Sequence, residues 1–173
     1  MCSIQKANKL ISLGLHYKSN ETLERVKKLG LGYLIQDHLY DAATKGNLEV
    51  LQWAKEKGIG WNEFTLSKNA AEAGQLQILI WMKNENMFLH TWICKFAAQF
   101  GHLEVLEWGF ANKNLLTIDN PLTVDLCRKA AENGHLDILK WLKKNNCIWD
   151  RFLSFYASNK HILDWIEQGE ICS

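Results

Sequence analysis

The stretch that decides the fold is "AAENGHLDILKWL", residues 130–142, because three weaker copies of it occur upstream. They are "AATKGNLEVLQWA" at 42–54, "AAEAGQLQILIWM" at 70–82 and "AAQFGHLEVLEWG" at 97–109. The glycines of the four copies are spaced by 28, 27 and 33 residues, and their tryptophans share these intervals: Gly46, Gly74, Gly101, Gly134 and Trp53, Trp81, Trp108, Trp141. Two markers with one period between 20 and 50 residues indicate stacked supersecondary units.

Each copy predicts two helices joined by a glycine turn. The first helix ends in an alanine pair, usually with a larger apolar residue four positions earlier (Leu66, Ile93, Leu126), so one face lets two helices approach closely. The glycine suits a left-handed residue that ends this helix. The second helix opens with an acid or amide that suits its free N–H groups, at Glu49, Gln77, Glu104 and Asp137. Its apolar stripe is broad, which indicates a helix packed between neighbours.

Composition limits the possible functions. The 173 residues are 47% apolar and 23% charged, as in an ordinary folded protein, and Pro121 is the only proline, which favours helices over sheets. The net charge of +1 offers no overall field for nucleic acid or an anionic membrane. No apolar run is long enough to cross a bilayer, and the five cysteines form no C-x-x-C pair. We therefore expect a cytoplasmic protein without metal or disulfides.

The repeats predict a single all-α domain over residues 1–173. Weaker copies flank the clear ones: "NETLERVKKLGLG" upstream and "FYASNKHILDWIEQG" downstream. End copies of a solenoid diverge because each has a neighbour on one side only. Residues 1–38 are therefore predicted to form an amino-terminal cap or degenerate repeat, 39–149 four repeats, and 150–173 a capping repeat.

These residues resemble the ankyrin repeat. The family pattern A-A-x-x-G-H-x-E with paired aliphatics is matched by "AAQFGHLEVL" and "AAENGHLDIL", and more loosely around Gly46 and Gly74, over roughly residues 39–165. The resemblance implies a helical-repeat solenoid. Two intervals fall short of the family's period of about 33 residues, so we expect shortened or missing β-hairpin fingers. Only the stretch between Phe110 and Asp125 restores the full spacing and is a candidate for one full-size finger.

A tryptophan in each second helix is the second departure from the family, which normally has an aliphatic residue there. Trp-rich, short-period copies resemble arrays of large DNA viruses and protists, which implies a viral or host-interaction factor in the host cytoplasm. An aromatic platform for bases would need interleaved Lys and Arg. The regular placement of these tryptophans among Leu and Ile favours the core instead.

The histidines and cysteines that could bind a metal or take part in catalysis are better explained by structural roles. His102 and His135 each precede an acid by two positions, and residues two apart on a helix do not face each other. Turn and cap roles are therefore favoured over a metal site. Cys94 and Cys127 occupy matching places in neighbouring repeats, too far apart for a disulfide, and are predicted to be buried fillers. No catalytic or phosphate-binding motif occurs, so we expect no enzyme and no cofactor.

Partner binding falls on the two residues between each alanine pair and its glycine, which the fold does not dictate. The resemblance implies that they line a concave face that contacts partners: Thr44, Lys45, Glu72, Ala73, Gln99, Phe100, Glu132 and Asn133. Phe100 is the expected anchor of such a face, with packing under the 110–125 stretch as the alternative.

The function that follows is a non-catalytic module that binds another protein, as a monomer or as one component of a hetero-complex. The alternative is a structural subunit that joins a larger particle or assembly through its end caps. Neither hypothesis needs nucleic acid, a membrane or a cofactor. The residues do not name the partner, because solenoid surfaces vary independently of the scaffold.

Overall fold

The computed structural model describes residues 33–112, 124–146 and 152–168, together with Ile11, Glu21, Glu24, Arg25 and Lys28. Its helices are α3 (Tyr33–Thr44), α4 (Leu48–Glu56), α5 (Glu63–Glu72), α6 (Leu76–Asn84), α7 (Trp92–Phe100), α8 (Leu103–Ala111), α9 (Val124–Asn133), α10 (Leu136–Lys144), the 3₁₀ helix η1 (Leu153–Tyr156) and α11 (Lys160–Glu167). Within these ranges there is no strand. The predicted finger between Phe110 and Asp125 and most of the predicted amino-terminal cap lie outside the described residues.

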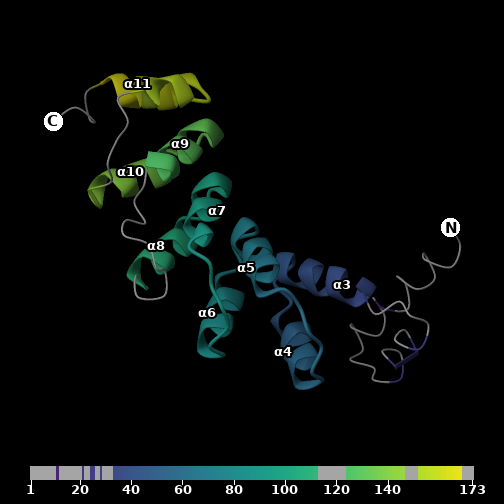
Figure 1. Ribbon diagram of the computed structural model, residues 1–173. Helices are drawn as coiled ribbons and strands as arrows, with labels where there is room; N and C mark the ends of the chain where they lie inside the picture. The colour runs from purple at the N-terminus through teal and green to yellow at the C-terminus, as the bar shows by residue number, and fades with distance from the viewer. Residues whose placement is uncertain are drawn as a thin grey trace, which may run out of the picture.

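The helices form two parallel layers. The first helices α3, α5, α7 and α9 pack side by side in chain order, and each also packs on its own second helix. Figure 1 shows the first helices along the inner side of one curved row and α4, α6, α8 and α10 along its outer side. At the carboxyl end, η1 packs on α9 and α11 packs on η1. The predicted fold class, an all-α helical-repeat solenoid, is confirmed.

Short connections replace the long fingers in the first two described steps. Residues 57–62 and 85–91 join successive repeats through turns and irregular backbone, without strand. Three of the second helices, α4, α6 and α10, are followed two residues after their end by a left-handed residue: Gly58 (φ 64°), Asn86 (φ 55°) and Asn146 (φ 58°). Gly58 and Asn86 turn the chain back towards α5 and α7 within a few positions.

The core lies between the layers and is built from the residues that recur. All four alanine pairs are buried, as are Leu66, Ile93 and Leu126 on the same helix faces. Small residues at the contact let neighbouring first helices approach closely. Trp53, Trp81 and Trp165 are buried, while Trp108 and Trp141 are half-buried against the core. The prediction that the periodic tryptophans belong to the core is confirmed.

One hydrogen-bond ladder runs through the glycine turns. The side chain that follows Gly74, Gly101 or Gly134 reaches back to a carbonyl near the end of the first helix of the preceding repeat. Nε2 donates in each step: Gln75 to Thr44 O (3.0 Å), His102 to Glu72 O (2.8 Å) and His135 to Gln99 O (3.1 Å). Because a carbonyl only accepts, the hydrogen of each imidazole sits on Nε2. The histidines therefore tie repeats together.

The glycines make room for this ladder. Gly46, Gly74 and Gly101 all have positive φ, between 70° and 84°. A Cβ at these positions would lie 2.5–2.6 Å from the ladder side chain of the next repeat. Gly134 ends the series, with the Asn159 and Ser158 side chains 3.2 Å from the place of its Cβ. Backbone conformation and lack of space thus both require glycine.

A second set of contacts joins the carboxyl ends of the outer helices. Residues two positions after each tryptophan contact the next repeat. They are the Lys55–Glu85 ion pair, the Lys83–Asn112 hydrogen bond, the Phe110–Trp141 ring contact at 5.4 Å and Lys143 Nζ above the Trp165 ring at 5.8 Å. The residue types change from step to step, so this set constrains the sequence less than the glycine ladder does.

Replacing Gly101 by Asn tests the space that the ladder requires. Asn tolerates left-handed backbone, as Asn86 and Asn146 show, so the cost comes from the new Cβ, 2.6 Å from the His135 ring. We expect Gly101→Asn to lower the free energy of unfolding by about 2 kcal/mol in urea denaturation. Gly58→Asn is the matched control, since a Cβ there meets nothing within 4 Å. Equal losses of unfolding free energy in the two variants would contradict the claim that the ladder needs the space at Gly101.

His38 gives the fold a pH dependence. It stands where later repeats have Leu66, Ile93 and Leu126, and burial lowers its pKa below the ordinary 6.5, partly offset by Asp41 and Asp37. The neutral imidazole stabilises the fold above pH 6.5, and this stabilisation is lost as the pH falls towards the lowered pKa.

His38→Leu should raise the free energy of unfolding by about 1 kcal/mol near neutral pH by extending the apolar face. The melting temperature of the variant should also fall less than that of the natural protein between pH 7.5 and pH 5.5, measured by circular dichroism. An equal fall of the melting temperature in both proteins would show that His38 does not cause the pH dependence of stability.

Candidate protein-interaction surface

The eight residues predicted for partner binding lie at the carboxyl ends of the stacked inner helices. Each pair occupies the last turn or the residue after it: Thr44 and Lys45 on α3, Glu72 and Ala73 on α5, Gln99 and Phe100 on α7, Glu132 and Asn133 on α9. Because α3, α5, α7 and α9 pack side by side, the four ends form one continuous row.

The polar members of this row bond mainly within their own helix. Lys45 pairs with Asp41 at 2.7 Å, and Glu132 pairs with Lys129 at 2.6 Å. Thr44 Oγ1 donates to Tyr40 O, and Asn133 Nδ2 donates to Lys129 O. The carbonyls of Thr44, Glu72 and Gln99 also accept the ladder hydrogen bonds. This end of the layer thus has a structural role in addition to any binding role.

Phe100 stands apart from these polar residues. Its side chain is 45% exposed, and most of the 110–125 stretch, the alternative packing partner, lies outside the described residues. Trp92, Phe96 and Phe100 follow one another at four-residue spacing, which places them on one side of α7. Trp92 is 51% exposed, and half-buried Phe96 lies between the two. An unbroken aromatic stripe therefore runs the length of α7.

The stripe continues past the start of α7 into neighbouring elements. The rings of Phe64, His90 and Trp92 contact one another, with centroids 5.1–6.0 Å apart. Phe88, 60% exposed, meets His90 at 6.0 Å, and Trp92 meets Phe96 at 6.4 Å. We call this set the aromatic face: Phe64, Phe88, His90, Trp92, Phe96 and Phe100.

Only the third repeat carries such a stripe among the described repeats. The positions equivalent to Trp92, Phe96 and Phe100 hold short or polar residues elsewhere. These are Asp37, Asp41 and Lys45 on α3, Thr65, Asn69 and Ala73 on α5, and Asp125, Lys129 and Asn133 on α9. The scaffold therefore does not require aromatics here, because the other repeats stack without them.

The charges beside the aromatic face are paired within the surface. Lys68 lies 3.6 Å from Glu72, with its Nζ 5.7 Å from the Phe96 centroid, and Lys95 lies 3.4 Å from Asp125. Each pair is partly exposed and contributes little to stability. Their effect is to leave the flanks of the aromatic face close to neutral, so a partner gains there mainly by burying apolar surface.

The sequence analysis found one member of the aromatic face and missed the rest. Phe100 was identified from its position between the alanine pair and the glycine. Trp92 and Phe96 share its four-residue spacing in "TWICKFAAQF", a signal that searching for aromatics outside the repeat consensus would have found. Phe64 and Phe88 lie in other segments, and their approach becomes visible only in the fold.

Among the described residues there is no metal-binding cluster, and Cys94 and Cys127 are buried. This part of the chain contains no group of three or more His, Cys, Asp or Glu side chains placed to hold a metal ion. Both cysteines are buried as predicted, and burial raises the pKa of Cys94 to about 12. A thiol with such a pKa remains protonated at neutral pH and is a poor nucleophile.

Comparison of the sequence with known protein families finds no match, and comparison with curated proteins finds none either. Within the described residues, every helix is too short or too polar to cross a membrane. The candidate site therefore rests on its own geometry, which is an exposed aromatic face on a stack of helices that pack without it.

Proposed function

We propose that this protein is a non-catalytic, ankyrin-type interaction module that binds another protein through the aromatic face of α7. The observation that carries this proposal is the exposure of Phe88, Trp92 and Phe100, which are 60%, 51% and 45% exposed. Large aromatic side chains dominate the energies of protein interfaces, and a contiguous exposed set of them on a soluble surface marks an interaction site.

The scaffold suits this role because its backbone is fixed independently of the face. The ladder and the alanine pairs hold α7 between α5 and α9, so its stripe is presented on a rigid helix. A preformed surface loses little conformational entropy on binding. The polar row of Thr44, Lys45, Glu132 and Asn133 would form the rim of the interface, where polar contacts fix orientation.

Trp92→Ser combined with Phe100→Ser tests this function. Both side chains are largely exposed, so the free energy of unfolding should change by no more than about 1 kcal/mol. Proteins captured from a cell lysate by the natural protein should be depleted at least about tenfold with the double variant, as measured by quantitative mass spectrometry.

Ile80→Ser is the matched control, because Ile80 is an exposed apolar residue on the outer helix α6, 36% exposed. It should retain the captured proteins. Retention by the double variant, or equal loss from the control, would refute the assigned face.

The carboxyl end of the stack favours a second candidate function, assembly with further copies. When Ala157 is aligned with Ala130, Phe155 takes the position of Lys95 and Arg128 in the preceding repeats. Those two residues contact the following repeat, Lys95 by an ion pair with Asp125 and Arg128 over the ring of Tyr156. Phe155 is 83% exposed, and its ring lies 6.1 Å from that of Phe152. We propose that this position provides a joining contact if the protein is a structural subunit.

Sedimentation velocity over a range of protein concentrations distinguishes this second function from the first. Assembly through the end predicts a sedimentation coefficient that rises with concentration, and Phe155→Ser should abolish the rise by removing the apolar contact. Ile80→Ser should leave it intact. If the natural protein remains monomeric at every concentration, Phe155 has no role in assembly and the second function is refuted.

A further inference from the structure

An open groove runs between the outer helices α4 and α6 and continues over the short connections that follow them. It consists of two hollows, of about 510 and about 410 Å³, that share Lys55 and Glu85. The volumes are in the range of small binding sites. Gln52, Glu56 and Glu85 on its walls are exposed, so the groove is open along its length and suits a chain that passes over it.

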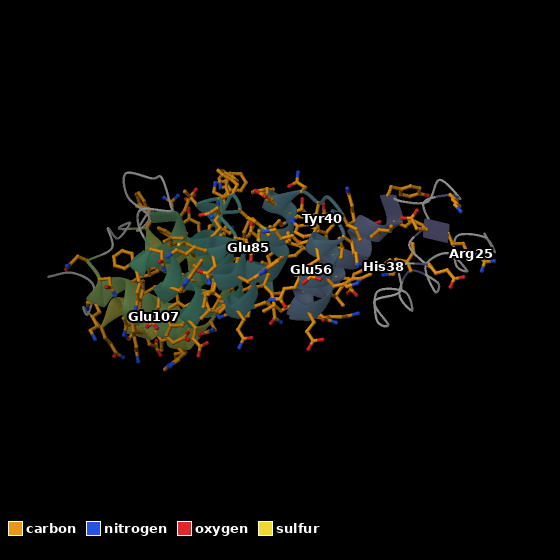
Figure 2. All side chains as sticks on the ribbon, turned by 90° about the horizontal axis from the view of Figure 1, so that it is seen from below. Arg25, His38, Tyr40, Glu56, Glu85 and Glu107 are labelled. Atoms are coloured by element: carbon orange, nitrogen blue, oxygen red, sulfur yellow. The ribbon has the colours of Figure 1, made fainter. Side chains whose placement is uncertain are left out.

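The groove carries an excess of negative charge. Its lining contains three carboxylates, Glu56, Glu63 and Glu85, and a single ammonium group, that of Lys55. Lys55 pairs with Glu85 at the point where the hollows meet. Glu63 accepts a hydrogen bond from Phe88 N at 2.7 Å, and Glu56 has no ion pair within the described residues. Figure 2 shows Glu56 and Glu85 next to each other, with Glu107 farther along the molecule.

Indole rings line the groove beside these carboxylates. Trp81 lines the first hollow and Trp61 the second, with ring centroids 6.3 Å apart and planes inclined by 49°. A carboxylate next to an indole suits a guanidinium group, which is planar, binds carboxylates through two parallel N–H bonds and stacks on aromatic faces. A lysine ammonium satisfies only part of this arrangement.

The carboxylates of the groove are specific to this one step between repeats. The positions equivalent to Glu56 hold Asn84, Ala111 and Lys144, and those equivalent to Glu85 in later repeats hold Asn112 and Asn145. Lys83 and Asn112 make the corresponding contact between the next repeats without a carboxylate. Other repeats therefore stack without acids at these positions. The charge of Glu56 is available for a ligand, and that of Glu85 becomes available when Lys55 is displaced.

We propose that this groove binds an arginine-containing, positively charged segment of a partner protein. An incoming guanidinium pairs with Glu56, and a second one competes with Lys55 for Glu85. Half-buried Trp61 offers them an aromatic face, and buried Trp81 forms part of the floor of the groove. Lys55 thus acts as an internal competitor that occupies the groove until the partner arrives. The groove shares no lining residue with the aromatic face, although Glu63 of the groove accepts the hydrogen bond from Phe88 N. Variants of Glu56 and of Trp92 and Phe100 therefore test the two proposals independently.

A labelled nonapeptide of alternating arginine and glycine is the probe, with alternating lysine–glycine and glutamate–glycine peptides for comparison, in a fluorescence anisotropy titration of the full chain. We expect binding in the order arginine, lysine, glutamate, and weaker binding with added salt. Glu56→Gln should weaken arginine-peptide binding by about fivefold. Lys55→Met should strengthen it several-fold, because removing the competitor frees Glu85.

Glu107→Gln is the matched control. It makes the same charge change on exposed Glu107 of α8, and it should leave the affinity unchanged, as should the Trp92→Ser, Phe100→Ser variant. Three results overturn the proposal: no preference for the arginine peptide over the glutamate peptide, equal weakening by Glu56→Gln and Glu107→Gln, or weaker binding by Lys55→Met. The last result would make Lys55 a structural support of the groove instead of a competitor.

Discussion

The hydrogen bond from each turn side chain to a carbonyl of the preceding repeat is the constraint on which the stack depends. Gln75, His102 and His135 make it in successive steps. In each step the glycine of the preceding repeat, Gly46, Gly74 or Gly101, leaves the space for the donor because it lacks a Cβ. The segment from the alanine pair to the tryptophan therefore has one length in all four repeats. The connections outside it vary freely, which is why the repeat interval ranges from 27 to 33 residues.

Recurrence made the fold predictable from the sequence. Each recurring feature reflects a local requirement that is visible within ten residues of sequence. The alanine pairs allow close helix approach, the glycines allow left-handed backbone, and the acids or amides at the start of the second helices complement the helix dipole. The role of His102 and His135 could not be read in this way. Their acceptors lie 30 and 36 residues upstream, and only the stacking distance between repeats reveals which carbonyl each imidazole meets. A turn or cap role was the nearest local description, although neither side chain caps its own helix.

The binding surface was only partly predictable for a related reason. Alignment of the repeats identifies positions that the fold leaves free, and the eight predicted residues lie in one row at the helix ends. It does not show which free positions become contiguous across elements. Phe64 on α5, Phe88 in the connection between α6 and α7, and Trp92 on α7 form one cluster. They meet because this connection passes over the start of α5, where Glu63 accepts a hydrogen bond from Phe88 N. The approach of these rings depends on the backbone conformation of the connection, which an alignment of the repeats does not reveal.

Departures from the repeat are the most informative residues in such a chain. Stacking needs small, apolar or ladder-forming residues at fixed positions, so a position that tolerates Asp, Thr and Trp in different copies is not used for stacking. Aromatics gather at such positions on α7, and carboxylates gather at others between α4 and α6. Neither group stabilises the scaffold enough to be required by it, since Asn112 replaces a carboxylate and Ala73 replaces an aromatic in neighbouring repeats. An exposed aromatic or an unpaired acid that contributes little to folding is best explained by contact with another molecule.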